Sequence, residues 1–376
     1  MNQNNEPKNR GFFTTDTMSN NNSAVEKDSA TSIENDALKA FSKSHLMHRI
    51  FILALALFVV ALVSMMLGRY FASPVDVINE IIAGIQGNDS HDPKLATALF
   101  NIRIPRIIMV IMVGMGLSVA GASYQGMFKN PLVSPDLLGA AAGASFGACL
   151  AMLLDLGNEY IQLFAFITGM IAVGLVMMIN KVVRGDVLLG LILGGILVGT
   201  LFTGGTSIIK LVADADDKLP AITFWLMGSF AGIVKSDLPP VCIPMIAGFL
   251  LVLTQGWNLN AMSFGEEDAS TLGVRTRLTR TLVIVGATLL TASSIAVAGI
   301  IGYIGLVVPH LTRAIVGPNY LILLPTTMLT GAAFLLLVDN FARLIYSVEI
   351  PIGLLTSILG VPFFIFIYRK NLRGWS

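Results

Sequence analysis

The sequence predicts an all-α, polytopic helical membrane protein, and three observations lead to that fold class. Hydrophobic residues make up 55% of the chain and charged residues only 12%, against about 25% charged in soluble domains. The mean hydropathy is +0.77. Beyond Arg106 the chain is a nearly continuous series of apolar stretches, and the short turns between them hold almost all of the remaining charge. A helix of about 18 apolar residues crosses the hydrocarbon core and satisfies its own backbone hydrogen bonds there.

Residues 1–45 differ from the rest because they are polar and rich in Asn, Ser, Thr and charge, without an apolar helical stripe. Such a segment buries too little apolar surface to offset the entropy of ordering it, so we expect a disordered tail in the cytoplasm. The apolar stretch begins only near Ile50 and no cleavage site of small residues follows it. The first span is therefore predicted to be an uncleaved anchor rather than a signal peptide. Residues 46–376 are predicted to form one transmembrane domain.

Apolar length marks about ten transmembrane helices in this domain. The ranges are 49–68, 106–124, 137–154, 160–180, 187–208, 239–255, 281–298, 303–316, 321–338 and 352–368. The eighth is short and glycine-rich and contains Pro309. We expect a broken or half-length helix there rather than a full crossing, because proline removes a helical hydrogen bond.

An even number of spans puts both termini on one side of the membrane, and the distribution of basic residues chooses that side. Thirteen lysines and arginines fall on the side of the termini: Lys39, Lys43, Arg49, Lys129, Lys181, Arg184, Arg275, Arg277, Arg280, Arg313, Arg369, Lys370 and Arg373. Eight fall on the other side: Arg69, Lys94, Arg103, Arg106, Lys210, Lys218, Lys235 and Arg343. The excess predicts that both termini lie in the cytoplasm, and the outer basic residues need an explanation of their own.

Small residues recur at helical spacing in two of the spans. One GxxxGxxxG series consists of Gly139, Gly143 and Gly147, and a second glycine series consists of Gly190, Gly194, Gly195 and Gly199. In lipid, small residues at this spacing let helix backbones approach closely. We interpret each series as packing within one subunit, in preference to a dimer seam.

The chain contains no familiar catalytic motif and no metal-ligand spacing. It lacks GxxxxGK[ST], GxSxG and HExxH patterns, and its four histidines are scattered. Cys149 and Cys242 lie far apart, in or beside apolar stretches, which is typical of small buried hydrophobic residues. The net charge of +1 gives no sign of nucleic-acid binding. We expect no catalytic residue, no metal site and no resident cofactor; if ATP drives this protein, a partner subunit binds it.

Ionisable side chains are nearly absent from the middle of the spans. Those nearest to the spans sit at predicted ends and are Asp186, His310, Arg313, Asp339, Arg343 and Glu349. Ion-coupled carriers usually place acidic relays at mid-membrane. The pattern therefore disfavours an ion-coupled secondary carrier, and also an intramembrane hydrolase with paired carboxylates.

The longest predicted cytoplasmic loop joins the sixth and seventh spans. Ser263 stands three residues before Glu266, the spacing of a capping box, and Gly273 stands where a helix-ending glycine belongs. These signals predict a short capped helix on the cytoplasmic face. The helix either seats in a groove of a soluble partner or simply links two spans.

Residues Gly265–Gly273 (GEEDASTLG) resemble the coupling loop of the iron-siderophore and vitamin B12 permease family of ABC importers, whose transmembrane subunits are of the FecCD type. Further blocks agree with that family in the same order. They are Arg103–Arg106 (RIPR), Gly126–Gly139 (GMFKNPLVSPDLLG), Gly302–Leu311 (GYIGLVVPHL) and Glu349–Gly353 (EIPIG). The resemblance covers most of the chain beyond the polar tail, which lies outside it.

The resemblance implies a B12-importer-type permease fold and a transport subunit that performs no chemistry itself. Permeases of this family dimerise around a central translocation path, two cytoplasmic ATP-binding subunits engage their coupling loops, and a substrate-binding protein docks outside. We therefore expect those partners for this chain, with a periplasmic or lipid-anchored binding protein and an identical or paralogous second permease. The expected location is a bacterial inner membrane.

The resemblance also implies roles for particular residues. Outer arginines of the family pair with acidic residues of the binding protein, and Arg103 and Arg106 match by motif while Arg343 matches by position. Arginine suits this role because its planar fork binds carboxylates bidentately, although snorkelling to the membrane interface is an alternative for each. The residues implied to form the ATPase coupling loop are Gly265, Glu266, Glu267, Ala269, Leu272 and Gly273.

The fifth span is our choice for lining the translocation path, because its glycines permit movement, although they equally suit packing. The chosen residues are Gly194, Gly195, Gly199, Thr200 and Thr203. For the cargo we expect a ferric siderophore, since siderophore permeases are the commonest members of the family, with cobalamin or haem as alternatives. No pocket of aromatic or charged side chains in the sequence points to one of them.

Overall fold

A computed structural model describes residues 46–67, 73–86, 92–182, 186–345 and 348–372. Helices account for most of these residues, and none of the residues described belongs to a strand. The predicted tail, residues 1–45, lies outside them. The chain divides into the units Met1–Phe51 and Ile52–Ser376. The second unit holds nearly all of the described residues, and the architecture below is that of this unit.

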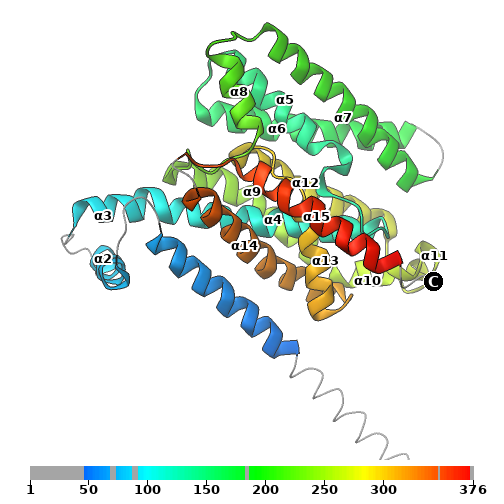
Figure 1. The fold of residues 1–376 in the computed structure, drawn as a ribbon. Coiled ribbons are helices and arrows are strands. Elements are labelled where there is room, and N and C mark those ends of the chain that lie inside the picture. Colours follow the sequence, from blue (N-terminus) through cyan, green and yellow to red (C-terminus); the bar gives the residue numbers. More distant parts are fainter. Residues whose placement is uncertain (1–45, 68–72, 87–91, 183–185, 346–347, 373–376) are drawn as a thin grey trace, which may run out of the picture. The chain divides into compact units, whose positions relative to one another are not determined.

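The helices follow one another in the order labelled in Figure 1, after a first helix, Leu46–Met66. The longer ones are α2 (Pro74–Gln86), α4 (Ile104–Met127), α5 (Ala140–Leu153), α6 (Asn158–Val182), α7 (Val187–Val212), α9 (Leu238–Leu253), α12 (Thr276–Ala298), α13 (Ile304–Val316), α14 (Tyr320–Leu344) and α15 (Ile352–Leu372). The shorter ones are α3 (Pro93–Thr97), η1 (Ala98–Arg103), η2 (Pro135–Leu138), α8 (Lys218–Leu226), η3 (Lys235–Asp237), α10 (Gly256–Phe264) and α11 (Glu266–Thr271).

Every predicted span overlaps a helix. Among the residues that the structure describes, seven helices are long and apolar enough to cross a membrane: Leu46–Met66, Pro93–Met127, Asn158–Val182, Val187–Val212, Lys235–Leu253, Thr276–Ala298 and Tyr320–Leu344. Shorter apolar helices, Ala140–Leu153, Ile304–Val316 and Ile352–Phe363, occupy the remaining predicted positions. The predicted all-α, polytopic fold class is confirmed. The predicted number of about ten spans agrees with the structure only approximately.

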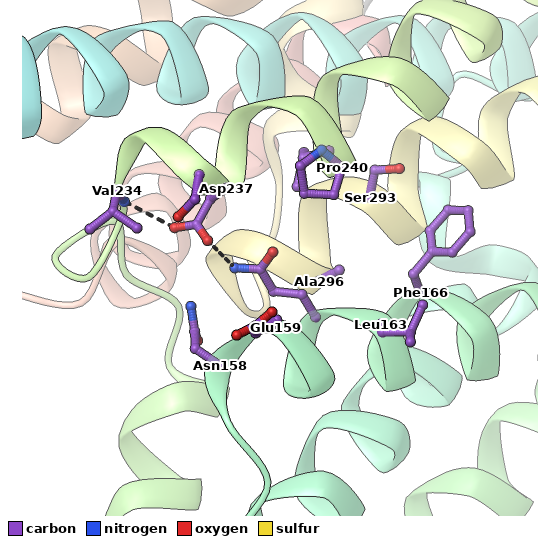
Figure 2. A pocket seen from close by; sticks show the side chains of 12 residues that line it. Asn158, Glu159, Leu163, Phe166, Val234, Asp237, Pro240, Ser293 and Ala296 are labelled. Atoms are coloured by element: carbon purple, nitrogen blue, oxygen red, sulfur yellow. Dashed lines mark hydrogen bonds between the residues drawn. The ribbon is translucent and has the colours of Figure 1, made fainter.

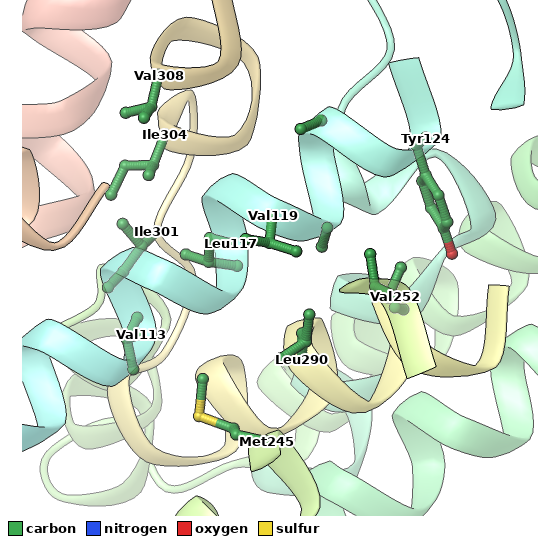
Figure 3. Packing of buried hydrophobic residues seen from close by; sticks show 14 of the residues in the cluster. Val113, Leu117, Val119, Tyr124, Met245, Val252, Leu290, Ile301, Ile304 and Val308 are labelled. Atoms are coloured by element: carbon green, nitrogen blue, oxygen red, sulfur yellow. The ribbon is translucent and has the colours of Figure 1, made fainter. Parts of the chain in front are cut away.

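Helix α4 is at the centre of the bundle. It packs against α9, α12, α13 and α14, and 78% of the most apolar part of Pro93–Met127 is buried, against 22% for α7. Figure 3 shows Met245 of α9, Leu290 of α12 and Ile304 of α13 gathered around Leu117 of α4 in one buried cluster. A helix that is apolar on all sides can be covered in this way by neighbours on all sides.

The helix of the second predicted span begins earlier than the sequence suggested. Helical structure runs from Pro93 to Met127, 35 residues in all, instead of starting at Arg106. Within it η1 is a π-helical turn, in which the Ile104 N–H donates to the carbonyl of Leu99. Pro105 has no N–H to donate, and a wider turn directly before it lets the helix continue. At about 1.5 Å per residue the helix is about 52 Å long, more than the roughly 30 Å hydrocarbon core.

Glycines set the closest helix crossings. A Cβ atom added to Gly114 of α4 would lie 2.5 Å from the carbonyl oxygen of Gly331 in α14. A Cβ on Gly143 of α5 would lie 2.6 Å from the carbonyl oxygen of Thr168 in α6, and one on Gly147 2.4 Å from that of Phe164. The interpretation of Gly143 and Gly147 as packing positions within one subunit is therefore confirmed.

Helix α13 has 13 residues and is half-length, as predicted, but Pro309 does not break it. The interruption lies earlier, between the end of α12 at Ala298 and Ile304, where Gly299 (φ +68°) and Tyr303 (φ +64°) take left-handed backbone conformations. Pro309 is the sixth residue of the helix and has no N–H for the Gly305 carbonyl, which instead accepts a hydrogen bond from Nε2 of Gln125 at 3.4 Å. The prediction of a proline-interrupted helix was wrong about the position of the interruption.

The two ends of the bundle carry different groups of residues. At one end α4 begins, α14 ends and α15 begins; we call it the Arg106 end. At the other α4 ends, α12 and α14 begin, and α10 and α11 pack across them; we call it the Glu266 end. The Asn260 side chain of α10 fixes this second end by accepting a hydrogen bond from the Tyr320 N–H at 2.8 Å.

Candidate functional site

Arg106 is held between two carboxylates at its own end of the bundle. Its Nη2 lies 2.8 Å from Oδ1 of Asp339 in α14, and its Nε also faces that carboxylate. Its Nη1 donates to both carboxylate oxygens of Glu349 at 2.9 Å each. The side chains of Arg106 and Asp339 are 7% and 0% exposed. One planar guanidinium thus joins α4, α14 and the segment that precedes α15.

Arg343 extends this arrangement by one helical turn. Its Nε lies 3.2 Å from Oδ2 of Asp339, four residues earlier in α14. Its Nη2 donates to Oγ of Ser64, in the first helix, at 2.7 Å, and also to the Asn340 side chain. Arg343 therefore connects the end of the first helix to α14.

Arg103 makes a second connection to the first helix, because its Nη1 donates to the carbonyl oxygen of Met65 at 2.6 Å. Arg103 and Arg106 stand three residues apart on the same helix and are both buried, each 5% exposed. We call Arg103, Arg106, Asp339, Arg343 and Glu349 the arginine–carboxylate cluster.

The structure brings together the three arginines that the sequence nominated for docking, but it buries them. Their partners Asp339 and Glu349 were not recognised from the sequence as members of the same site. The four-residue spacing of Asp339 and Arg343 on one helix was the available signal. Loss of either carboxylate would leave buried positive charge with fewer partners, which is costly in a medium of low dielectric constant. The docking role of these arginines stays a prediction.

The predicted short helix exists at the Glu266 end as α11; its coupling role stays a prediction. Gly265 separates it from α10 with φ +145°, a conformation that favours glycine. The predicted capping box from Ser263 to Glu266 is wrong, because the Ser263 hydroxyl donates to the carbonyl of Asn260 within α10. The N-cap position of α11 is taken by Gly265, so Ser263 belongs to the last turn of the preceding helix.

The predicted end of this helix is confirmed. Gly273 has φ +81°, its N–H donates to the carbonyl of Ser270, and the N–H of Val274 donates to that of Ala269, both at 3.0 Å. This pair of hydrogen bonds is a Schellman ending. Ala269 is fully buried against Met262 and Val274, so the helix has one face fixed to the body of the protein.

The outward face of α11 is acidic and partly apolar. Glu267 is exposed, and Leu272 directly after the helix is 60% exposed. Glu266 turns back to form an ion pair with Arg280 in the first turns of α12. The Arg280 side chain is 8% exposed and that of Glu266 45%. This ion pair links a surface helix to a long buried helix.

The residues predicted to line a path on α7 divide into two groups. Gly194 and Gly195 are buried, and a Cβ on Gly195 would lie 2.1 Å from the carbonyl oxygen of Leu137, so these glycines are packing positions. Gly199 is half-buried and also faces the η2 region, near Gly139.

Thr200 and Thr203 are exposed, and so is Ser207. At three- and four-residue spacing these side chains share one face of α7, where they form a polar stripe on an otherwise apolar helix. Leu201 and Ile208, which are also exposed, lie on another face of the helix. The geometry leaves the stripe available to line a path.

A cavity of about 520 Å³ that the sequence did not indicate lies between α6, the start of α9 and the end of α12 (Figure 2). At its wall the Gln162 Nε2 donates to Oδ1 of Asp237 at 3.0 Å, and the Val234 N–H donates to Oδ2 at 2.9 Å. Among the described residues, its lining includes the carboxylates of Glu159 and Asp237 and no lysine or arginine. Within the part of the chain that is described, no three His, Cys, Asp or Glu side chains gather to hold a metal ion.

These features define a polytopic α-helical membrane protein with a buried charged cluster at one end and a surface helix at the other. The chain belongs to the FecCD transport family, whose model matches residues 55–370. It is accordingly a permease subunit of an ABC importer.

Two curated relatives cover most of the chain. The molybdate import system permease protein MolB of Haemophilus influenzae is 38% identical over 86% of this chain and 96% of its own length. An iron chelatin transport system permease protein of Helicobacter pylori is 33% identical over 86% of this chain and 98% of its own. A solved structure titled as an inward-facing conformation of a metal-chelate type ABC transporter matches with a TM-score of 0.76 and 35% identity, over 85% of this chain and 98% of that one.

Proposed function

We propose that this chain is the membrane subunit that passes a ferric siderophore, delivered by a substrate-binding protein, while ATP is hydrolysed in separate cytoplasmic subunits. The proposal rests on one observation: a single helical bundle has an ion pair between helices at each of its two ends. Arg106 and Asp339 tie α4 to α14 at one end, and Glu266 and Arg280 tie α11 to α12 at the other. Long helices packed against α4 connect the ends.

The Glu266 end faces the cytoplasm in this proposal, and so do both chain termini. The excess of lysine and arginine on that side supports the orientation. Each of two ATP-binding subunits would receive one α11. Exposed Phe264 and Leu272, which are 77% and 60% exposed, flank the acidic residues of the helix. Exposed apolar side chains beside charged ones are suited to a contact with a soluble partner.

The Arg106 end faces outward, and the binding protein docks over it. Arg103, Arg106 and Arg343 supply the positive charge, and acidic side chains on the partner would supply the complement. The location is the plasma membrane of a bacterium.

A second permease subunit, identical or paralogous, completes the path. The polar stripe of Thr200, Thr203 and Ser207 would face it across the path, because α7 is among the long helices least covered by its own chain. Hydroxyl groups without charge allow a large solute to pass without being held tightly. The glycines Gly194 and Gly195 would let α7 stay close to the helices that move it.

Movement would start at α11. Closure of the ATP-binding subunits would push this helix, and the ion pair of Glu266 with Arg280 would carry the shift into α12. Rigid helices would then open the bundle at one end while closing it at the other, which is alternating access.

A metal-containing solute is the cargo class that the relatives favour. An iron chelate is the first candidate, since the Helicobacter pylori relative is named for iron chelatin and matches over nearly its whole length. Molybdate is the second candidate, because a relative with higher identity, 38%, is named for its import.

Uptake by cells tests the proposal. Cells with and without this gene would be given radiolabelled ferric siderophores, molybdate, cobalamin or haem in parallel. Loss of ferric siderophore uptake alone is the expected result. Loss of molybdate, cobalamin or haem uptake alone would change the assigned cargo and leave the assignment as a permease unchanged. Uptake that survives removal of the ATP-binding subunit would overturn the ATP-driven mechanism in favour of a secondary carrier.

A further inference from the structure

Glu349 is the most accessible of the four ion-paired side chains in the arginine–carboxylate cluster. Its side chain is 27% exposed. Those of Arg106 and Asp339 are 7% and 0% exposed, and that of Arg343 is 9% exposed. An acidic group that approaches the Arg106 end therefore meets Glu349 before it meets a guanidinium.

We propose that Glu349 is a positioning residue for docking. In the undocked permease its carboxylate binds Nη1 of Arg106, and on docking an acidic side chain of the binding protein takes its place there. The inference rests on the proposed function, because it requires a binding protein that docks at the Arg106 end. Docking is then an exchange of one carboxylate for another at Nη1 of Arg106, with no covalent change.

The hydrogen bonds of Arg106 divide in a way that permits this exchange. Nη1 donates to Glu349 alone, at 2.9 Å to each oxygen. Nε and Nη2 donate to Asp339, which is fully buried. Departure of Glu349 leaves Asp339 in contact with both guanidiniums, so neither buried arginine loses its last carboxylate, and the incoming acidic side chain restores the second negative charge. The pair that is exchanged is the partly exposed one, which is the weaker of the two.

The backbone around Glu349 is held independently of its carboxylate. The Ile350 N–H donates to the carbonyl of Ala342 at 3.2 Å, and the Ile352 N–H donates to that of Gly228 at 2.9 Å. The side chain of Glu349 is therefore able to swing outward while the start of α15 stays in place.

Charge balance explains what the exchange achieves. Arg106 and Arg343 carry two positive charges, and Asp339 and Glu349 carry two negative ones. With Glu349 in place, the charges of these four groups balance, and Arg103 adds the one remaining positive charge of the cluster. When Glu349 leaves, a positive charge becomes available to a carboxylate that fits the same bidentate geometry. The internal competitor weakens docking, which keeps the binding protein able to dissociate after delivery.

The test is the affinity of the cognate substrate-binding protein for the complete permease–ATPase complex in lipid nanodiscs, measured by surface plasmon resonance at low salt. Glu349→Gln removes the competing charge and keeps the shape of the side chain. We expect its affinity to rise about two- to fivefold, the range for loss of a partly exposed ion pair. Glu349→Asp, which is shorter by one methylene, is the second variant and is expected to shift the affinity in the same direction by less.

Asp155→Asn is the matched control. Asp155 forms an ion pair with Lys218 at 2.6 Å, and the alternation of helices puts it on the same side of the membrane, away from the cluster. We expect this variant to bind like wild type. The melting temperature of each complex is measured in parallel. A merely structural role for Glu349 would lower the melting temperature and weaken docking, the opposite sign.

Unchanged or weaker docking of both Glu349 variants would overturn the inference. If the wild type still docks the binding protein and supports uptake, the proposed function stands. An equal gain for Asp155→Asn would also overturn the inference, since the effect would then be general electrostatics. Failure of the wild-type complex to dock the binding protein would overturn the proposed docking itself, and the inference with it.

Discussion

Arg106 and Asp339 stand 233 residues apart in the sequence, and their side chains meet 2.8 Å apart inside the bundle. The contact joins α4 to α14, the same helices that cross closely at Gly114 and Gly331. A glycine crossing sets the distance between two helices, and a charged pair sets their register. The relative position of α4 and α14 is therefore determined at two points, which favours movement of the two helices as one rigid body.

We expect Asp339→Asn to destabilise the protein by about 3 kcal/mol, because it leaves the buried charges of Arg106 and Arg343 with one carboxylate fewer. The measurement is the melting temperature of the purified protein in detergent. Asp155→Asn, which removes a carboxylate with a 75% exposed side chain, is the control and is expected to cost less than about 1 kcal/mol. A wild-type melting temperature for Asp339→Asn would contradict a stabilising role for the buried pair.

Apolar length located the long and half-length apolar helices of the bundle, because the thickness of a bilayer fixes how long a spanning helix must be. It gave no sign of α2 or α8. It failed at Pro93–Met127, where Lys94 and Arg103 interrupt the apolar run although the helix continues. The π-helical turn before Pro105 depends on backbone register, and composition carries no signal for it. Similarly, Pro309 suggested a broken helix, whereas Tyr303 and Gly299 mark the real interruption.

The sequence allowed us to predict the arginines of the candidate site. It did not allow us to predict that they meet Asp339 and Glu349 in one cluster. Motif resemblance selected Arg103 and Arg106, and position relative to the last block selected Arg343. Their meeting with Asp339 and Glu349 depends on which helices cross, and that is decided by packing across the whole bundle. The capping box at Ser263 failed for a related reason, since a single glycine with φ +145° moved the start of the next helix.

The link between α11 and α12 gives a second prediction. We expect Glu266→Gln and Arg280→Gln each to lower the stimulation of ATP hydrolysis by loaded binding protein about two- to fivefold, the range for loss of a partly exposed ion pair. Arg277→Gln is the matched control, because Arg277 lies one turn before Arg280 on α12, is exposed and has no ion-pair partner in the described chain. The measurement is phosphate release by the reconstituted complex.

Arg280 distinguishes two explanations of such a loss. Its side chain is 8% exposed, so a docked ATP-binding subunit has little access to it. If only Glu266→Gln reduces the stimulation, Glu266 acts by direct contact with the partner. An equal loss for Arg280→Gln supports transmission through the ion pair.

The packing of α5 on α6 gives a third prediction. In Gly143→Ala the new Cβ would lie 2.6 Å from both the Ala172 Cβ and the Thr168 carbonyl oxygen, so the helices must separate. We expect a loss of about 1–3 kcal/mol, the usual cost of overpacking, seen as a lower melting temperature. Gly174→Ala on α6 is the control, because a Cβ there meets nothing within 4 Å. Alanine should leave stability unchanged or raise it by up to about 1 kcal/mol, through its helix propensity. Equal effects of the two substitutions would contradict a close crossing at Gly143.

The polar stripe of α7 gives the last prediction. If Thr203 faces a water-filled path, Thr203→Cys should react with a membrane-impermeant thiol reagent, because only a hydrated thiol ionises and attacks it. Leu201→Cys is the matched control: Leu201 is 67% exposed, but it stands two residues from Thr203 and so points to the opposite side of the helix, about 160° away. Both variants are made with Cys242→Ser, since Cys242 is the less buried native cysteine, and the assay is done on the assembled importer in liposomes. We expect labelling of Thr203→Cys at least about tenfold faster than that of Leu201→Cys, and faster still in whichever nucleotide state opens the path to the reagent. Equal, slow labelling of both positions would place the stripe against lipid or protein instead and would remove α7 from the path.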